Sequence, residues 1–591
     1  MAFHPGLPNL ASTWSELGRI LISDCDCTRG LFILSSMGKR QDRKGTTVTT
    51  KLAAELACAF SSQHGLDIGS LIAKCDHQHA IDDFFTPQRV LGSGGFGKVW
   101  KVVHNKTGMA ETVKCIPKTD GEGSTECVVA EIQSLLRLDH PNVSRIYQWF
   151  ENRSHVYIVM ELIKGADLES YIQDPDLHLL FCQLMKALTY CHAKSVVHRD
   201  VKLENCLVED SDGKVLKLID FGLAATWKPT DPGMTSRCGT CYYLSPNIIQ
   251  GLAYSSKCDI WAAGVILYML VTNEHPFCSG EVKSTFDREK LFENILRRQI
   301  RKEPLRECGA TKAENDLIRD MLAKSAGMRL TAAEALDKCR CMQQDGQLDA
   351  GIDLRILLAR AKTFSEHSTS FVRAILRIIA RHMEDDDLCP LRKAFEHVNT
   401  SGDGCITREE MSTAFLRAGL TEEGASAMFK VVDGAAQSIE YTQWLIATMS
   451  SELISREQSV LNAFHFLDSD SCGKLGKGDL ERALGKDAVA EAWCWKAKPT
   501  DSLELDEFRC IMSSIAERRA CLAEAVSAPD TLGVLGQGGS VVHGHQAVAK
   551  ARSWNSEKAQ PDVLPCLLGR SEVLSLPKTR SLLSRKLSEL L

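Results

Sequence analysis

Residues 198–205 read His-Arg-Asp-Val-Lys-Leu-Glu-Asn, and residues 220–222 read Asp-Phe-Gly. Transfer of a phosphoryl group needs metal ligands and a carboxylate that orients the attacking hydroxyl. Asn205 and Asp220 offer two oxygen donors of the kind that magnesium binds, and Asp200 offers the carboxylate. These two short stretches therefore predict a centre for phosphoryl transfer.

A glycine-rich turn lies upstream, at Gly92-Ser93-Gly94-Gly95-Phe96-Gly97-Lys98-Val99. Glycines let backbone amides approach phosphate oxygens. Lys114 follows the turn and Glu131 lies on a helical stretch, so this pair can hold the lysine against the α and β phosphates. A second glycine-rich stretch at 536–540 has no such lysine after it, and we assign it no role. We expect the nucleotide to contact Leu91, Gly92, Ser93, Gly94, Gly95, Phe96, Gly97, Lys98, Val99, Lys114, Met160 and Glu161.

This ordered set of motifs resembles the protein kinase catalytic domain. The resemblance implies an α+β, bilobal fold over residues 84–341, with strands at 98–103 and 156–160, a helix over 128–138 and a hairpin within 206–219. Lys202 resembles the lysine of the serine/threonine branch, in which it stabilises phosphate charge. The catalytic residues implied by the resemblance are Asp200, Lys202, Asn205, Asp220, Lys114, Glu131 and Thr240.

Two positions depart from the family pattern. Asn247 follows Ser245-Pro246 where the family has Ala-Pro-Glu, and Thr112 replaces the alanine that lines the adenine pocket. The family's glutamate pairs with a later arginine, here Arg329. We expect the Asn247 amide to give only a weaker, uncharged hydrogen bond to that arginine.

Residues 391–516 contain helix, loop, helix units that recur about every 35 residues, which indicates an all-α domain of calmodulin-like EF-hands. An EF-hand loop needs oxygen ligands at positions 1, 3, 5, 7, 9 and 12, and glycine at position 6. The first loop offers Asn399, Ser401, Asp403, the Cys405 carbonyl, Thr407 and Glu410. The third loop offers Asp468, Asp470, Cys472, the Lys474 carbonyl and Asp479.

The other two loops are poorer. The second, which starts at Asp433, is one residue short, and the fourth has Lys496 and Lys498 where acids belong. Even in the third loop, the Cys472 thiol is a weak ligand for a hard cation. We therefore expect calcium only at the first and third loops.

Residues 342–390 form the junction between the two halves. Over 345–390 the pattern predicts one amphipathic helix, with apolar and basic positions alternating at helical spacing. The apolar positions are Phe371, Ile375, Leu376 and Ile379, and the basic positions are Arg373, Arg377 and Arg381. Such a helix can occupy either the catalytic groove or a groove between EF-hand helices, but not both.

The order of kinase domain, basic junction and four EF-hands resembles the calcium-dependent protein kinases of plants and protists. The resemblance implies a serine/threonine kinase that uses ATP, Mg²⁺ and Ca²⁺, with the junction helix inhibiting the kinase until calcium binds. Asp167 and Glu204 resemble the acidic subsite of basophilic kinases, which implies protein substrates with a basic residue before the target, although ordinary solvated carboxylates fit these positions equally well.

Composition narrows the partners and the compartment. The net charge is -6 without a basic cluster, which argues against nucleic acid. The longest apolar run, 260–271, is too short to span a bilayer, and the 23 cysteines lack zinc spacing. We expect a cytoplasmic monomer with reduced thiols, and poorly ordered extensions at 1–83 and 517–591.

Two alternatives remain open at this point. The EF-hand region could be a structural clamp that folds without metal on a calcium-independent kinase. The catalytic domain could instead be a pseudokinase scaffold, although Lys114, Asp200 and Asp220 are all present.

Overall fold

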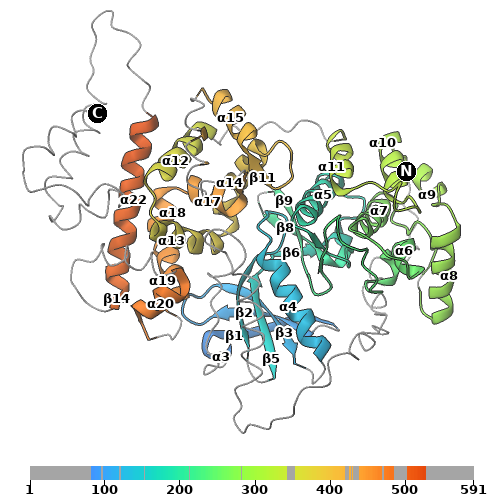
Figure 1. Cartoon of the computed structure of the whole chain (residues 1–591), viewed down its shortest axis with the longest axis horizontal. Coiled ribbons are helices and arrows are strands. Elements are labelled where there is room, and N and C mark those ends of the chain that lie inside the picture. The colour runs from blue at the N-terminus through green and yellow to red at the C-terminus, as the bar shows by residue number, and fades with distance from the viewer. Residues whose placement is uncertain are drawn as a thin grey trace, which may run out of the picture.

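The computed structural model describes residues 81–527 except for 95–96, 119–121, 152–153, 212, 281, 343–352, 420–424, 427–428, 430–437, 469–471 and 485–501. Figure 1 shows a sheet-rich lobe, a helical lobe beside it, and a second helical unit that the chain forms afterwards. Residues 1–80 and 528–591, which hold most of the two expected extensions, lie outside the described residues.

The small lobe is a five-stranded antiparallel sheet with one long helix. Its strands lie in the order β1-β2-β3-β5-β4. Its elements are α3 (Ile81–Phe84), β1 (Phe85–Gly94), β2 (Gly97–His104), β3 (Ala110–Pro117), α4 (Glu122–Leu136), β4 (Ile146–Glu151) and β5 (His155–Glu161). Side chains alternate across the sheet, so Ile158 joins the core beneath α4 whereas Val159 packs on the opposite face. The predicted strands and helix are confirmed here.

The large lobe is built around α7 (Lys257–Thr272), whose residues from Cys258 to Thr272 are all buried. The predicted apolar run is therefore a core helix. Among the described residues, none of the helices combines the length and the apolar character needed to cross a bilayer. The other helical elements are η2 (Leu168–Tyr171), α5 (Leu177–Ala193), η3 (Leu203–Asn205), η4 (Cys241–Tyr243), α6 (Pro246–Ile249), α8 (Thr285–Arg297), α9 (Glu303–Glu307), α10 (Lys312–Met321) and α11 (Ala332–Arg340). The strands are β6 (Gly165–Asp167), β7 (Val196–Val197), β8 (Cys206–Ser211), β9 (Gly213–Leu218) and β10 (Ala225–Thr226), and β8 with β9 forms the predicted hairpin.

The second helical unit, which we call the regulatory unit, covers 354–527. Its helices are α12 (Leu354–His367), α13 (Ser370–Arg381), α14 (Asp385–Val398), α15 (Arg408–Arg417), α17 (Tyr441–Thr448), α18 (Ser451–Ser455), α19 (Glu457–Leu467), α20 (Lys477–Leu484) and α22 (Leu505–Ser527). Its short strands are β11 (Cys405–Thr407), β12 (Ser438–Glu440), β13 (Lys474–Gly476) and β14 (Ser502–Glu504). They join the loops in two antiparallel pairs, with Ile406 opposite Ile439 and Leu475 opposite Leu503. The last helix continues past residue 516, where we expected the unit to end.

The junction is not one helix, and that prediction is wrong. It divides into α12, α13 and the start of α14, because Ser368 ends the first helix and the Thr369 hydroxyl accepts a hydrogen bond from the Val372 amide to cap the next. The predicted apolar positions of α13 are nevertheless buried, and they belong to the core of the regulatory unit. The junction is therefore part of that unit in this structure.

The regulatory unit contacts both the sheet-rich lobe and the helical lobe. On the large lobe, Lys186 of α5 pairs with Glu396 at 2.8 Å. On the small lobe, the Asp139 carboxylate accepts hydrogen bonds from the Thr442 hydroxyl and amide at 2.7 and 2.8 Å, and the Arg145 guanidinium donates to the Ala380 carbonyl. The position of the regulatory unit is therefore set by both lobes at once.

The expected hydrogen bond between Asn247 and Arg329 is absent. Arg329 is 2% exposed and donates to the carbonyls of Ala323, Lys257 and Lys324. The Oδ1 atom of Asn247 is buried and has no hydrogen-bond partner among the described residues. Burial lowers the pKa of Arg329 to about 10, since no carboxylate compensates the charge.

We expect Asn247→Glu to stabilise the kinase domain. A carboxylate at this position would pair with the buried Arg329 guanidinium and contribute about 1.5 kcal/mol, the lower end for a hydrogen bond to a charged group. Thermal melting of the full chain measures the effect, and Asn247→Gln is the uncharged control. Equal melting temperatures for the glutamate variant and the wild type would contradict the pairing.

A second prediction concerns the docked regulatory unit. Gly404 has φ +84°, and an added Cβ would lie 2.4 Å from the His140 ring and 2.7 Å from the Tyr190 ring of the kinase domain. Gly473 occupies the same position in the third loop with φ +82°, and nothing lies within 4 Å of its added Cβ. Gly404→Ala should therefore loosen docking, whereas Gly473→Ala adds only the backbone strain. Hydrogen exchange at 139–144 should accelerate in the first variant alone, and equal exchange in both would refute this.

Candidate functional site

Lys114, the predicted phosphate-binding lysine, pairs with a carboxylate on α4 of the small lobe and with one of the large lobe. The ammonium of Lys114 on β3 is 2.5 Å from Oε1 of Glu131 on α4 and 2.8 Å from Oδ1 of Asp220. Burial favours the neutral amine, but the two carboxylates outweigh it and raise the pKa of Lys114. The predicted pair of Lys114 and Glu131 is thus formed, and a third residue joins it.

The two predicted magnesium ligands are Asn205, at the end of the 198–205 stretch, and Asp220. Burial would raise the pKa of Asp220, but the ammonium of Lys114 holds it below its usual range, so this carboxylate is ionised. The Asn205 amide nitrogen donates to the Asp200 carbonyl at 2.9 Å, so the side-chain oxygen is the atom of Asn205 that could bind a metal. One ionised carboxylate and one amide oxygen are hard donors and fit magnesium.

The Asp200 carboxylate is held in one orientation. Its Oδ1 accepts hydrogen bonds from the hydroxyl and amide of Thr240 at 2.7 and 2.9 Å, and its Oδ2 lies 2.9 Å from the ammonium of Lys202. The same ammonium donates to the Thr240 hydroxyl. The three predicted residues therefore form one network, in which the acid is fixed and the lysine is close to it.

Asp259 on α7 holds the catalytic loop, residues 198–205, in place. The sequence motifs did not indicate this role. Its buried carboxylate accepts hydrogen bonds from the His198 and Arg199 amides at 2.9 and 2.8 Å, and it contacts the His192 ring. Arg199 has φ +66°, an uncommon conformation for a residue with a side chain. The acid at the start of a core helix thus holds a strained catalytic loop.

The glycine-rich turn joins β1 and β2, with Gly94 opposite Gly97 in the strand register. Gly97 has φ +119°, and an added Cβ would lie 2.1 Å from the Cys115 carbonyl, so only glycine fits there. Gly95 and Phe96, two of the predicted nucleotide contacts, lie outside the described residues.

Glu161, a predicted nucleotide contact, uses its carboxylate for ion pairs within the protein. The Glu161 side chain is buried and binds Lys217 and Arg145, at 3.1 and 3.0 Å. Its carboxylate is therefore part of the structural link between strands and cannot face a nucleotide. Met160, the residue before it, is half-buried and remains available.

The predicted acidic subsite contains a third carboxylate. Burial, together with the nearby charges of Asp167 and Glu204, raises the pKa of Glu169 to about 7. Glu204 is largely buried, and its Oε2 has no hydrogen-bond partner among the described residues. A basic group bound beside these three carboxylates would reduce the repulsion between their negative charges.

The first loop of the regulatory unit is closed by its own hydrogen bonds. The Glu410 carboxylate accepts from the Ser401 and Thr407 amides at 2.6 and 2.8 Å, and Asn399 Oδ1 accepts from the Ser401 hydroxyl. Among the described residues, no three His, Cys, Asp or Glu side chains converge as a metal cluster. Calcium at this loop would therefore depend on hydroxyl, amide and backbone oxygens as well as on Asp403 and Glu410.

The third loop holds an orphaned carboxylate oxygen. Asp468 is 1% exposed, and its Oδ2 accepts a hydrogen bond from the Gly473 amide at 3.0 Å. Its Oδ1 is buried and has no hydrogen-bond partner among the described residues, which fits a cation ligand. The Cys472 thiol donates to the Lys474 carbonyl, which is itself a predicted ligand of this loop. Asp470 and Asp433 lie outside the described residues, as do Lys496 and Lys498.

Fold and site together define a protein kinase. Residues 85–339 match the family model of the protein kinase domain. The chain is 30% identical over 439 residues to calcium-dependent protein kinase 12 of Arabidopsis thaliana, which covers 72% of this chain and 85% of that protein. It is 31% identical over 435 residues to calcium-dependent protein kinase 22 of the same plant, which covers 68% and 83%. Calcium-dependent protein kinase 4 of Plasmodium falciparum (isolate 3D7) is 28% identical over 464 residues, which covers 71% and 84%.

The chain therefore belongs to the calcium-dependent protein kinase family. It is a protein serine/threonine kinase, and its cofactors are ATP, Mg²⁺ and Ca²⁺.

We expect Lys114→Met and Asp220→Asn each to reduce phosphoryl transfer by several orders of magnitude, because each removes one member of a three-charge network at the phosphates. Radiolabelled phosphate transfer to a serine peptide measures the loss. Lys290→Met, which changes an exposed lysine on α8, is the matched control. Activity above a few per cent of wild type in either cleft variant would contradict these roles.

Proposed function

We propose that the chain transfers the γ-phosphoryl group of Mg-ATP to Ser or Thr of protein substrates under the control of calcium. The simultaneous contact of Lys114 with Glu131 and Asp220 is the observation that carries the proposal. This geometry aligns the small lobe, the helix α4 and the metal-binding loop, and phosphoryl transfer needs all three in place.

In the proposed step, the substrate hydroxyl oxygen attacks the γ phosphorus as the bond to the β–γ bridging oxygen breaks. Asp200 accepts the hydroxyl proton, and Lys202 stabilises charge on the transferred group. Thr240 keeps the Asp200 carboxylate oriented through two hydrogen bonds. Magnesium held by Asn205 and Asp220 would supply charge neutralisation at the phosphates.

The acidic cluster of Asp167, Glu169 and Glu204 supports a substrate with a basic residue before the target. A guanidinium would pair with the unpartnered Glu204 oxygen and lower the mutual repulsion of the three acids. The selectivity of the kinase would then come from this edge of the cleft.

Residues 391–516 act, in this proposal, as four EF-hand units of which the first and third bind calcium. The paired strands β11–β12 and β13–β14 support this assignment, because each pair joins two loops into one module. The buried, unpartnered oxygen of Asp468 supports a cation at the third loop. The Glu410 carboxylate, at the last position of the first loop, accepts a hydrogen bond from the Ser401 amide of the same loop. It is therefore close enough to the loop to serve as a ligand for a cation there.

The junction is the proposed inhibitory element. In this structure α12 and α13 are packed in the core of the regulatory unit, which supports assigning this arrangement to the released kinase. Without calcium, the same residues would leave that core and cover the catalytic groove. Calcium shifts the equilibrium only by its differential affinity for the two arrangements.

The test compares phosphoryl transfer by the full chain in calcium and in chelator. The full chain should be nearly silent in chelator and active in calcium, whereas a chain that ends at residue 341 should lose this calcium dependence. Thermal melting must show that both are folded, because the shorter chain loses a packed neighbour. Equal activity of the folded full chain under both conditions would instead favour a calcium-independent kinase with a structural clamp.

A further inference from the structure

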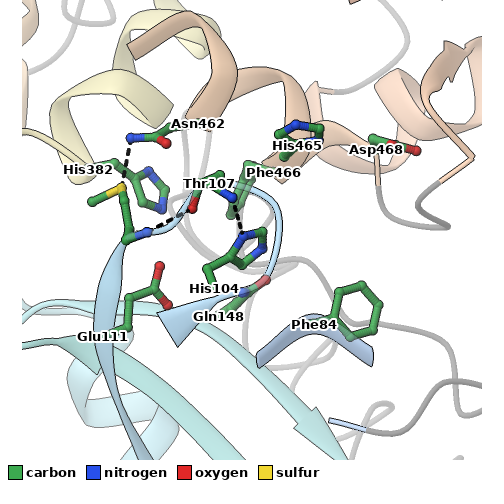
Figure 2. A pocket seen from close by; sticks show the side chains of 11 residues that line it. Phe84, His104, Thr107, Glu111, Gln148, His382, Asn462, His465, Phe466 and Asp468 are labelled. Atoms are coloured by element: carbon green, nitrogen blue, oxygen red, sulfur yellow. Dashed lines mark hydrogen bonds between the residues drawn. The ribbon is translucent and has the colours of Figure 1, made fainter. Parts of the chain in front are cut away.

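A small cavity lies where the kinase small lobe meets the regulatory unit (Figure 2). The turn between β2 and β3 forms one side, and α19 with the start of the third loop forms the other. Thr107 and Met109 on the turn contact the regulatory unit, since the Gln458 amide donates to the Thr107 carbonyl at 3.0 Å and the Asn462 amide contacts the Met109 sulfur. The turn is therefore fixed against α19.

Lys106 lies on the same turn and reaches the third loop. Its ammonium donates to Oδ2 of Asp468 at 3.2 Å, across the boundary between the two units. The Asp468 side chain is fully buried, and Lys106 is 34% exposed. A buried carboxylate without a compensating charge is costly, so this contact contributes to docking.

The two oxygens of Asp468 differ in their contacts. Oδ2 is shared by the Gly473 amide and the Lys106 ammonium, whereas Oδ1 is buried and has no hydrogen-bond partner among the described residues. A cation at Oδ1 and the ammonium at Oδ2 would share one carboxylate. The cation and the Lys106 ammonium would repel each other, because only one carboxylate group would lie between them. Solvent ions would screen this repulsion only in part, because the carboxylate is buried.

We propose that Lys106 of the kinase domain acts as a resident counter-ion of the third loop, which docks that loop and lowers its affinity for calcium. This inference rests on the proposed function, because it takes the third loop as a calcium site. Linkage requires the reciprocal effect, so calcium at the third loop weakens the contact between that loop and the small lobe. The kinase domain thereby sets the calcium threshold of its own regulatory unit.

Calorimetric calcium titration of the full chain tests this inference. Lys106→Met should tighten one site by about five-fold, the low end of the usual coupling between sites. Lys186→Met is the matched control, because it removes another ion pair between the units, with Glu396, that touches none of the proposed loop ligands. That variant should leave every affinity within about two-fold of wild type, as expected for a partly exposed pair.

The double variant Lys106→Met with Asp468→Asn should lose the tightened site. The gain in Lys106→Met should also shrink as salt is raised, because the effect is electrostatic. Unchanged or weaker binding in Lys106→Met, or a tightened site that survives Asp468→Asn, would overturn the proposal.

A second measurement reports docking directly. Hydrogen exchange at 104–109 should accelerate when calcium is added to the wild type, and should not respond in Asp468→Asn. No response in the wild type would also overturn the proposal. If calcium changes binding and exchange as described but leaves kinase activity unchanged, the proposed calcium control of the enzyme fails and the counter-ion role of Lys106 stands.

Discussion

The geometry of the cleft depends on one buried carboxylate, that of Asp259. Its two oxygens accept hydrogen bonds from consecutive amides, those of His198 and Arg199, and such bonds are strong because the acceptor is charged and shielded from water. They hold Arg199 at a positive φ that the chain would otherwise avoid. Asp200 is the next residue, so the orientation of its side chain depends on the unusual backbone conformation of Arg199. Thr240 and Lys202 then act on an acid that is already in place.

The same reasoning connects the small lobe to the metal-binding loop. Lys114 can keep its charge in a buried position only while Glu131 and Asp220 both remain close to it. A movement of α4 or of the loop that carries Asp220 would leave an unpaired charge. Because Asp139 and Arg145, just beyond α4, contact the regulatory unit, the docking of that unit and the position of α4 are mechanically related.

Asn247 and Cys472 are two residues at which this chain departs from the pattern expected for its fold. Asn247 leaves Arg329 with carbonyl oxygens and the face of Trp261, 5.1 Å away, in place of a carboxylate. This loss affects the large lobe and leaves the network around Asp200 intact. In the third loop, Cys472 bonds to a backbone carbonyl, so the ligand set there depends more heavily on Asp468. Neither residue contacts Asp200, Lys202 or Thr240 in the hydrogen bonds that hold the catalytic carboxylate.

The sequence by itself predicted that Lys114, Glu131 and Asp220 belong to one site, and it predicted the strands of the small lobe and the core helix α7. These features depend on residue type and short spacing, which local chain geometry turns directly into a site. Only the tertiary structure decided that Asp259 holds the catalytic loop, that the Glu161 carboxylate pairs with Lys217, and that Lys106 meets Asp468. Each of these outcomes joins residues far apart in the chain or depends on packing against another unit. Which residues pair across such sequence separations depends on the buried charges and apolar faces that the folded chain brings together. A local sequence pattern does not contain this information.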